Sequence, residues 1–229
     1  MNRMEAAFFR LKKIRQLWPN KTRMLITGAK GFAKQLLDVV FQLELQDGLV
    51  FYDDFDSEIT QLLSFPVLKS LEEASRYFSE HGPEFALGTG NPTLRHQMKI
   101  RLEAAGGQCI SLISPLARVA RYAKIGKGTC ILTGAVVEND AQIGEGALIN
   151  LNAMICHDSR IGNFVEVSPA AVVTGGCTIG DFSFIGSAAV LKPGIHVGKK
   201  TTVAAGAVVI KDLPDACMAA GVPATVKRL

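Results

Sequence analysis

The chain has 229 residues, of which 48% are hydrophobic and 20% charged, and its formal net charge is +4. This length suffices for one large or two modest domains, the composition excludes global disorder, and so small a charge excludes nucleic acid as a predicted partner. The five cysteines are odd in number, widely spaced and without a CxxC pair, so we expect neither a disulfide framework nor a structural zinc site.

Residues 1–22 interleave aromatic and aliphatic residues with Lys and Arg, which predicts a basic amphipathic leader. Such a helix could touch a membrane surface or a partner, pack on the adjoining domain, remain poorly ordered, or join an upstream fused domain. The chain has no run of 18 apolar residues and no signal-type apolar core. We therefore expect a soluble cytoplasmic protein, with the inner face of the membrane as a further location through the leader.

In residues 23–112, short apolar runs typical of strands alternate with segments that have the periodicity of a helix. Strands are predicted at about 24–27, 49–53, 85–87 and 109–113, and helices at about 32–45, 71–81 and 93–105, the first with Leu36, Leu37, Val40 and Phe41 on one face. This alternation predicts a small Rossmann-like α/β domain, with a parallel sheet and helices on its faces.

The predicted strand ends of this domain carry glycines and acids. Gly28-Ala-Lys-Gly31 separates the first strand from its helix, where backbone N–H groups and the helix dipole favour a phosphate. An acid that ends the second strand can bind ribose hydroxyls. A tight connection and solvated loop acids are the competing interpretation, but the order of the motifs favours a nucleotide-type ligand. The candidate binding residues are Gly28, Lys30, Gly31, Asp53, Asp54, Gly90 and Asn91.

From Ile113 to Val209 a branched aliphatic residue recurs every six positions, and a small residue usually stands two positions earlier. An aliphatic-Gly pair recurs every eighteen residues, from Ile125-Gly126 to Val197-Gly198. A period of six is neither that of a helix nor that of a simple strand. It predicts short strands joined by tight corners, three to a coil, with a continuous core. We expect a parallel β-helix over residues 113–212 and a C-terminal tail over 213–229.

The four histidines have different settings. We expect His81, His96 and His196 to be structural or exposed, whereas His157 follows the core position Ile155 and precedes Asp158. A carboxylate beside an imidazole orients it and makes it more basic, which suits a general base. A structural role for His157 is the competing interpretation. We expect no metal, because a zinc site of the γ-class carbonic anhydrase type needs three histidines in the middle coils.

From residue 24 to residue 229 the chain resembles the hexapeptide-repeat sugar acyltransferases, which include sialic acid O-acetyltransferases and bacterial 4-amino-sugar N-acetyltransferases. The resemblance is carried by Gly28-Ala-Lys-Gly31, Tyr52-Asp-Asp54, Asn150, His157-Asp158, Ile161-Gly-Asn-Phe164, Gly175-Gly176, Ile179-Gly-Asp181 and Gly221-Val-Pro-Ala224. It implies a left-handed β-helix and a homotrimer. It also implies that the sheet domain binds a nucleotide sugar and that acetyl-CoA binds between neighbouring β-helices.

The resemblance further implies residue roles. His157 would be the base, Asp158 its orienting acid, and Asn150 a polar contact near the reacting group. The Gly175 N–H would stabilise developing negative charge. The positions implied for acetyl-CoA are Gly175, Ala205, Lys211, Gly221 and Pro223.

One position departs from the family pattern. Many relatives have a second histidine nine residues after the base, where this chain has Glu166. An ionised carboxylate cannot donate a hydrogen bond to an acyl oxygen, but it can hold an amino group. The departure therefore favours an amine acceptor and makes Glu166 a candidate substrate contact.

The leading hypothesis is an acetyl-CoA-dependent N-acetyltransferase of bacterial glycan biosynthesis. Its acceptor would be the 4-amino group of a nucleotide-linked 4-amino-4,6-dideoxy sugar, with a UDP-linked, bacillosamine-type sugar as first choice, and the attack would be direct. The alternatives are an O-acetyltransferase of a sialic acid or a similar sugar, and a non-catalytic β-helix scaffold that binds nucleotide sugars.

Overall fold

The computed structural model describes residues 23–227. Contacts divide the chain into two compact units, one of residues up to 89 with 97–115, and one of residues 90–96 with 116–229. The division at 115 lies three residues beyond the expected end of the first domain. The predicted amphipathic leader, residues 1–22, lies outside the described residues.

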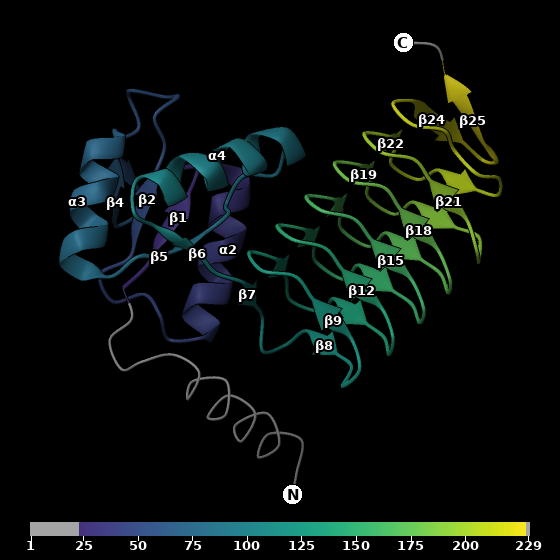
Figure 1. Cartoon of the computed structure of the whole chain (residues 1–229), viewed down its shortest axis with the longest axis horizontal. Coiled ribbons are helices and arrows are strands. Elements are labelled where there is room, and N and C mark those ends of the chain that lie inside the picture. Colours follow the sequence, from purple (N-terminus) through teal and green to yellow (C-terminus); the bar gives the residue numbers. More distant parts are fainter. Residues whose placement is uncertain (1–22, 228–229) are drawn as a thin grey trace, which may run out of the picture. The chain divides into compact units, whose positions relative to one another are not determined.

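The first unit is a mixed, largely parallel sheet with helices (Figure 1). Its strands are β1 (Leu25–Thr27), β2 (Val50–Tyr52), β3 (Gln61–Leu62), β4 (Phe65–Leu68), β5 (Glu84–Ala86) and β6 (Gln108–Cys109). The short strand β7 (Leu112–Ile113) is not part of this sheet. The helices of the unit are α2 (Gly31–Gln42), α3 (Leu71–His81) and the greater part of α4 (Pro92–Ala104). The sheet order is β3-β4-β2-β1-β5-β6, with only β3 antiparallel to its neighbour. The predicted α/β class is confirmed.

Two local features of this unit differ from expectation. The β3–β4 hairpin was not predicted, because its strands are short and interrupted by Pro66. Leu36, Leu37, Val40 and Phe41 were expected on one face of α2; the first three are buried, whereas the Phe41 side chain is 50% exposed. It lies at the edge of the helix, with its ring 6.2 Å from that of Phe65.

The second unit is a left-handed parallel β-helix whose stacked coils have three faces (Figure 1). The first face carries β10 (Cys130–Ile131), β13 (Leu148–Ile149), β16 (Glu166–Val167), β19 (Phe184–Ile185), β22 (Thr202–Val203), β24 (Met218–Gly221) and β25 (Ala224–Lys227). The second face carries β8 (Arg118–Val119), β11 (Val136–Val137), β14 (Met154–Ile155), β17 (Val172–Val173), β20 (Val190–Leu191) and β23 (Val208–Val209). The third face carries β9 (Lys124–Ile125), β12 (Gln142–Ile143), β15 (Arg160–Ile161), β18 (Thr178–Ile179) and β21 (His196–Val197).

The six-residue repeat forms the core of this β-helix. Strands eighteen residues apart pair in parallel, so that Ile143 lies on Ile161 and Ile161 on Ile179. These aliphatic positions are at most 4% exposed from Ile131 onward. In the first coil, Val119 and Ile125 are only half-buried, because a terminal coil has a neighbour on one side. The C-terminal tail extends the first face through the antiparallel pair β24 and β25.

The glycines that recur every eighteen residues are required because a Cβ at these positions would collide with the backbone of the next coil. A Cβ on Gly144 would lie 2.6 Å from the carbonyl carbon of Gly162, and one on Gly126 would lie 2.5 Å from that of Gly144. Backbone of successive coils is therefore in close contact at this corner. The left-handed backbone conformation falls two residues later, at Gly128, Gly146, Phe164, Phe182 and Lys200.

The first turn of α4 belongs to the β-helix unit and is fastened there by Arg95. The Arg95 side chain is 1% exposed and donates to the carbonyl oxygens of Gly146 (2.8 Å), Gly90 (2.5 Å) and Phe164 (3.0 Å). His96 adds ring contacts with Phe164 at 4.6 Å and with Phe182 at 5.4 Å. His96 is therefore structural, as expected.

Candidate active site

His157 stands on the corner between β14 and β15, where the second face meets the third. Its side chain is 66% exposed, and Nδ1 lies 2.8 Å from Oδ2 of Asp158. Asp158 adopts the left-handed conformation, with φ of 60°, which aspartate tolerates better than most residues. The corner thus holds the carboxylate beside one ring nitrogen, whereas the other, Nε2, has no hydrogen-bond partner among residues 23–227.

The electrostatics of this corner favour a basic imidazole. The hydrogen bond with Asp158 raises the pKa of His157 above its ordinary value, although desolvation acts in the opposite direction. The charges of Asp158 and Glu138 also raise this pKa, and Glu138 Oε2 accepts a hydrogen bond from the His157 backbone N–H at 3.0 Å. Sequence reasoning missed Glu138, which precedes His157 by nineteen residues and therefore lies on the coil below.

Gly175 occupies the same corner one coil above His157. A Cβ on Gly175 would lie 2.6 Å from Cε1 and 2.7 Å from Nε2 of His157, so only glycine leaves room for the ring. Within residues 23–227 the Gly175 N–H donates no hydrogen bond, whereas the N–H of Gly176 donates to the carbonyl oxygen of His157 at 2.9 Å. The corner therefore combines an imidazole with a free backbone donor, an arrangement that suits acyl transfer.

Lys211 stands on the same corner as His157 and Gly175, because it follows Gly175 by thirty-six residues and hence by two coils. At about 4.8 Å per coil, His157 and Lys211 are separated by about 14 Å along the corner. The remaining positions implied for acetyl-CoA lie near the C-terminal end of the β-helix. Ala205 falls between β22 and β23, and Gly221 and Pro223 form the turn between β24 and β25.

Asn150 and Glu166 lie elsewhere on the β-helix. Glu166 projects from β16 on the first face, and Asn150 follows β13 on that face. Both are buried, as is Ser168, whose hydroxyl donates to Glu166 Oε1 at 3.2 Å. The structure therefore brings Asn150 together with Glu166 but does not bring either to His157, which lies at the next corner, beyond β14 of the second face. Ser168 was missed because small polar residues are common at coil corners.

In the first unit, the Gly28 turn is tied to the end of β2. Gly28 has φ of 80° and its N–H donates to the Tyr52 carbonyl at 2.7 Å, while the Ala29 N–H donates to Asp53 Oδ2 at 3.0 Å. The other Asp53 oxygen accepts from the N–H groups of Phe55 and Asp56. Asp53 is only 6% exposed, so the structure shows it organising the turn.

The neighbouring polar residues have other partners. Asp54 pairs with Arg101. Burial raises the pKa of Asp54, but the hydrogen bonds from Arg101 and Tyr52 together bring it below its ordinary value. Lys30 lies 3.3 Å from Asp56 and is 68% exposed. The Lys69 ammonium, which sequence reasoning missed, closes the loop after β2 by donating to the carbonyls of Asp53 and Asp56.

The start of α2 is open. Gly31 begins the helix, a Cβ there would meet nothing within 4 Å, and no side chain caps the first turn. No acid lies in that turn, so its N–H groups remain available to an anion. Gly90 and Asn91 belong to the β-helix unit, and Asn91 Oδ1 accepts from the Leu94 N–H at the start of α4.

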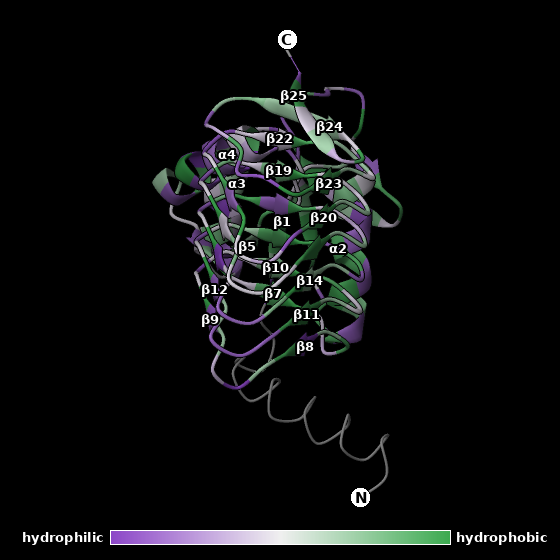
Figure 2. Ribbon diagram, turned by 90° about the vertical axis from the view of Figure 1, so that its right-hand side faces the viewer, coloured by the Kyte–Doolittle hydropathy of each residue, from purple (hydrophilic) through white to green (hydrophobic). Residues whose placement is uncertain are grey.

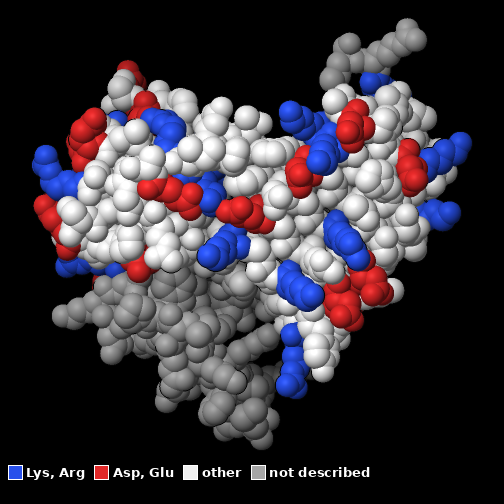
Figure 3. Space-filling model, in the orientation of Figure 1, with Lys and Arg blue, Asp and Glu red and all other residues white. Residues whose placement is uncertain are grey.

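Other classes of site find no support among residues 23–227. No group of three or more His, Cys, Asp or Glu side chains could hold a metal ion. No helix in this part of the chain is long and apolar enough to cross a bilayer. Basic and acidic side chains are intermixed over the visible surface (Figure 3).

Comparison with known proteins gives consistent results. Residues 23–102 match the family described as the PglD N-terminal domain. The acetyltransferase domain of PglB from Neisseria gonorrhoeae is 30% identical, with a TM-score of 0.84 over 90% of this chain and 100% of that one. PerB from Caulobacter crescentus, solved with CoA and GDP-perosamine, is 28% identical with a TM-score of 0.84 over 90% and 97%. WeeI from Acinetobacter baumannii is 27% identical with a TM-score of 0.82 over 90% and 100%. No curated protein matches the chain by sequence.

Proposed function

The chain belongs to the hexapeptide-repeat sugar N-acetyltransferases, and from this premise we propose that it transfers an acetyl group from acetyl-CoA to a nucleotide-linked amino sugar. The acceptor is the 4-amino group of a 4-amino-4,6-dideoxy sugar, with UDP as the first choice of nucleotide. The observation that carries the proposal is the corner at which His157, oriented by Asp158, lies against Gly175.

In this mechanism the sugar amine attacks the thioester carbonyl directly. His157 Nε2 accepts the proton that the nitrogen loses as the new C–N bond forms, and Asp158 stabilises the resulting imidazolium. The free Gly175 N–H donates to the carbonyl oxygen as it gains negative charge. Collapse of the tetrahedral intermediate breaks the C–S bond and releases the CoA thiolate, which then takes up a proton. No covalent enzyme intermediate is required.

The residues that stack along one corner of the β-helix, from His157 through Gly175 to Lys211, support a binding path for acetyl-CoA. With the thioester beside His157 and Gly175, an extended pantetheine arm runs toward Lys211, whose ammonium meets the phosphates. The turn Gly221 to Pro223 lies at the same end of the β-helix. In the first unit, the uncapped start of α2 at Gly31, with Lys30 before it, receives the diphosphate of the sugar nucleotide.

We further propose a homotrimer, supported by the second face of the β-helix. Its outward residues Val136, Met154, Val172, Val190 and Val208 stand in register on successive coils. Met154 and Val190 are each 36% exposed, and the strands of this face are largely hydrophobic (Figure 2). An apolar ladder of this kind is typical of a surface that another chain covers. His157 lies at the edge of this face, so the neighbouring chain would complete the site.

The experiment is release of free CoA, measured with a thiol reagent across UDP-, dTDP- and GDP-linked 4-amino sugars. The proposal expects turnover with at least one amino sugar and a product one acetyl group heavier. Turnover only with hydroxylated sugars such as sialic acids would replace it with the O-acetyltransferase. Nucleotide-sugar binding without turnover of any acceptor would favour the alternative of a non-catalytic scaffold that binds nucleotide sugars.

A further inference from the structure

Three buried polar side chains interrupt the aliphatic pattern where the first face of the β-helix turns toward the second. Glu166 is 9% exposed, Asn150 5% and Ser168 2%. Ser168 follows Asn150 by eighteen residues, so the two occupy the same position in consecutive coils, and the Asn150 N–H donates to the carbonyl of Val167 at 2.9 Å. We call these three residues the polar cluster.

The polar cluster has hydrogen-bonding groups to spare. Glu166 Oε1 accepts from the Ser168 hydroxyl, but Oε2 accepts from no residue between 23 and 227. The Asn150 Oδ1 accepts from the Leu151 N–H at 2.8 Å, whereas its amide NH₂ donates to none of those residues. Neither of these groups is among the fully buried polar atoms without a partner, which within residues 23–227 are Oε1 of Gln35 and Oε1 of Gln46, so both reach the surface of the polar cluster. An open acceptor and an open donor at the surface of one cluster can pair with a polar ligand.

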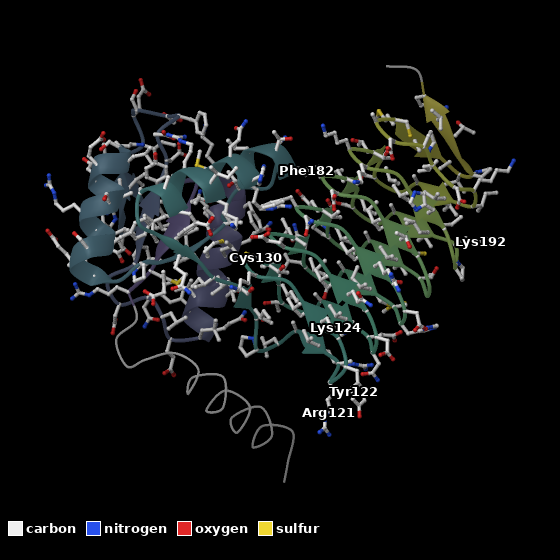
Figure 4. The ribbon with its side chains drawn as sticks, in the orientation of Figure 1. Arg121, Tyr122, Lys124, Cys130, Phe182 and Lys192 are labelled. Carbon is white, nitrogen blue, oxygen red and sulfur yellow. The ribbon has the colours of Figure 1, made fainter. Side chains whose placement is uncertain are left out.

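Glu166 forms no ion pair within residues 23–227. Burial raises the pKa of its carboxyl group, and the nearby charge of Arg95 opposes this. The Arg95 guanidinium is itself engaged with the carbonyls of Gly90, Gly146 and Phe164. A Cβ on Gly90 would lie 3.6 Å from Glu166 Oε2, so the Gly90 backbone lies close to this oxygen without a side chain to fill the space. Phe182, at the nearby corner, is labelled in Figure 4.

We propose that the polar cluster is the acceptor-amine subsite, in which Glu166 Oε2 accepts a charge-assisted hydrogen bond from the ammonium form of the sugar and the Asn150 amide donates to an adjoining sugar oxygen. The bound ammonium loses one proton to solvent before the neutral amine attacks, and His157 then takes the proton released as the C–N bond forms. This inference rests on the proposed function. A hydroxyl group in place of the amine carries no charge and offers a single donor, so the cluster selects amino sugars over their hydroxyl counterparts.

The position of the polar cluster also indicates that two chains contribute residues to each acceptor site. Glu166 projects from the first face, whereas His157 stands on the corner between the second and third faces. The width of the β-helix separates them within one chain. An acceptor that touches both residues therefore lies between two chains, with Glu166 from one and His157 from its neighbour.

The first test is calorimetric, without acetyl-CoA, and compares the best amino-sugar nucleotide of the acceptor panel with the same nucleotide sugar bearing a hydroxyl group at that carbon. The wild type should prefer the amine, and Glu166→Gln should lose that preference by about tenfold or more, the worth of a hydrogen bond to a charged group. Glu145→Gln, which removes a carboxylate from a neighbouring corner, should retain it. An unchanged preference in Glu166→Gln would overturn the inference.

Ser168→Ala provides a second variant should Glu166→Gln fail to fold. Removing the hydroxyl that holds Oε1 should weaken binding of the amine several-fold and leave binding of the hydroxyl analogue unaltered. Equal losses for both ligands would assign the cluster a structural role only.

The second test is complementation between chains. His157→Ala and Glu166→Gln subunits, each poorly active alone, are coexpressed with different tags and purified through both. If the two residues meet across an interface, some sites in the mixed trimer have both wild-type residues, and activity returns to a sizeable fraction of wild type. No recovery would contradict a shared site. A wild type that acetylates no amine would instead refute the proposed function, which keeps the two failures distinct.

Discussion

At the scale of residues, the His157–Asp158 pair controls how the reaction depends on pH. The base must be neutral to accept a proton, so kcat/KM should rise with pH through the pKa of His157, which the hydrogen bond with Asp158 sets above its ordinary value. Asp158→Asn removes that carboxylate, so the acidic limb of the pH–rate profile should move to lower pH. The plateau rate should fall about tenfold, because a weaker and less well oriented base remains.

The matched control for this variant is Asp140→Asn. Asp140 occupies the corner position one coil below Asp158 and has the same φ of 60°. Its replacement should leave the acidic limb in place. A limb that does not move in Asp158→Asn, or that moves equally in both variants, would remove Asp158 from its assigned role.

At the scale of elements, close contact between coils gives the recurrent glycines a stability role. A Cβ at Gly144 would lie 2.6 Å from the Gly162 carbonyl carbon and 2.7 Å from the Asn163 nitrogen, all backbone atoms that cannot turn aside. Gly144→Ala should therefore lower the free energy of unfolding by about 1–3 kcal/mol. Urea denaturation followed by circular dichroism at fixed protein concentration measures this.

Gly31→Ala is the control, since a Cβ there meets nothing within 4 Å and the residue begins α2. That variant should raise the free energy of unfolding by less than about 1 kcal/mol. Equal effects of the two variants would mean that the coils can separate to admit a methyl group.

The same elements show what a sequence can predict. The hexad positions predicted the β-helix because each coil repeats one packing rule, and Ile143, Ile161 and Ile179 obey it in register. The β3–β4 hairpin escaped prediction because two-residue strands carry no periodicity. At the site, His157 and Asp158 could be found from their adjacency, whereas Glu138 and Ser168 could not. Their roles depend on which residues the coil stacks together, and such common residues carry no signal of their own.

At the scale of the whole molecule, the apolar second face predicts assembly. Light scattering of the wild type should give a mass of three chains of 24.6 kDa each. Val172→Asp places a charge within the ladder of that face, where burial between chains would be costly, so it should yield monomers with little activity. Thr178→Asp, on the third face, should remain trimeric. A trimeric, fully active Val172→Asp would exclude this face as the interface.

The measurement that tests the account most directly is the acetylation rate of His157→Ala with saturating acetyl-CoA and the best amino-sugar acceptor. Loss of the general base should lower kcat by about 10² to 10⁴, with the affinity for acetyl-CoA unaltered. His196→Ala, which removes an exposed imidazole from β21, should retain the wild-type rate. A His157→Ala enzyme as fast as the wild type would contradict the mechanism at its centre.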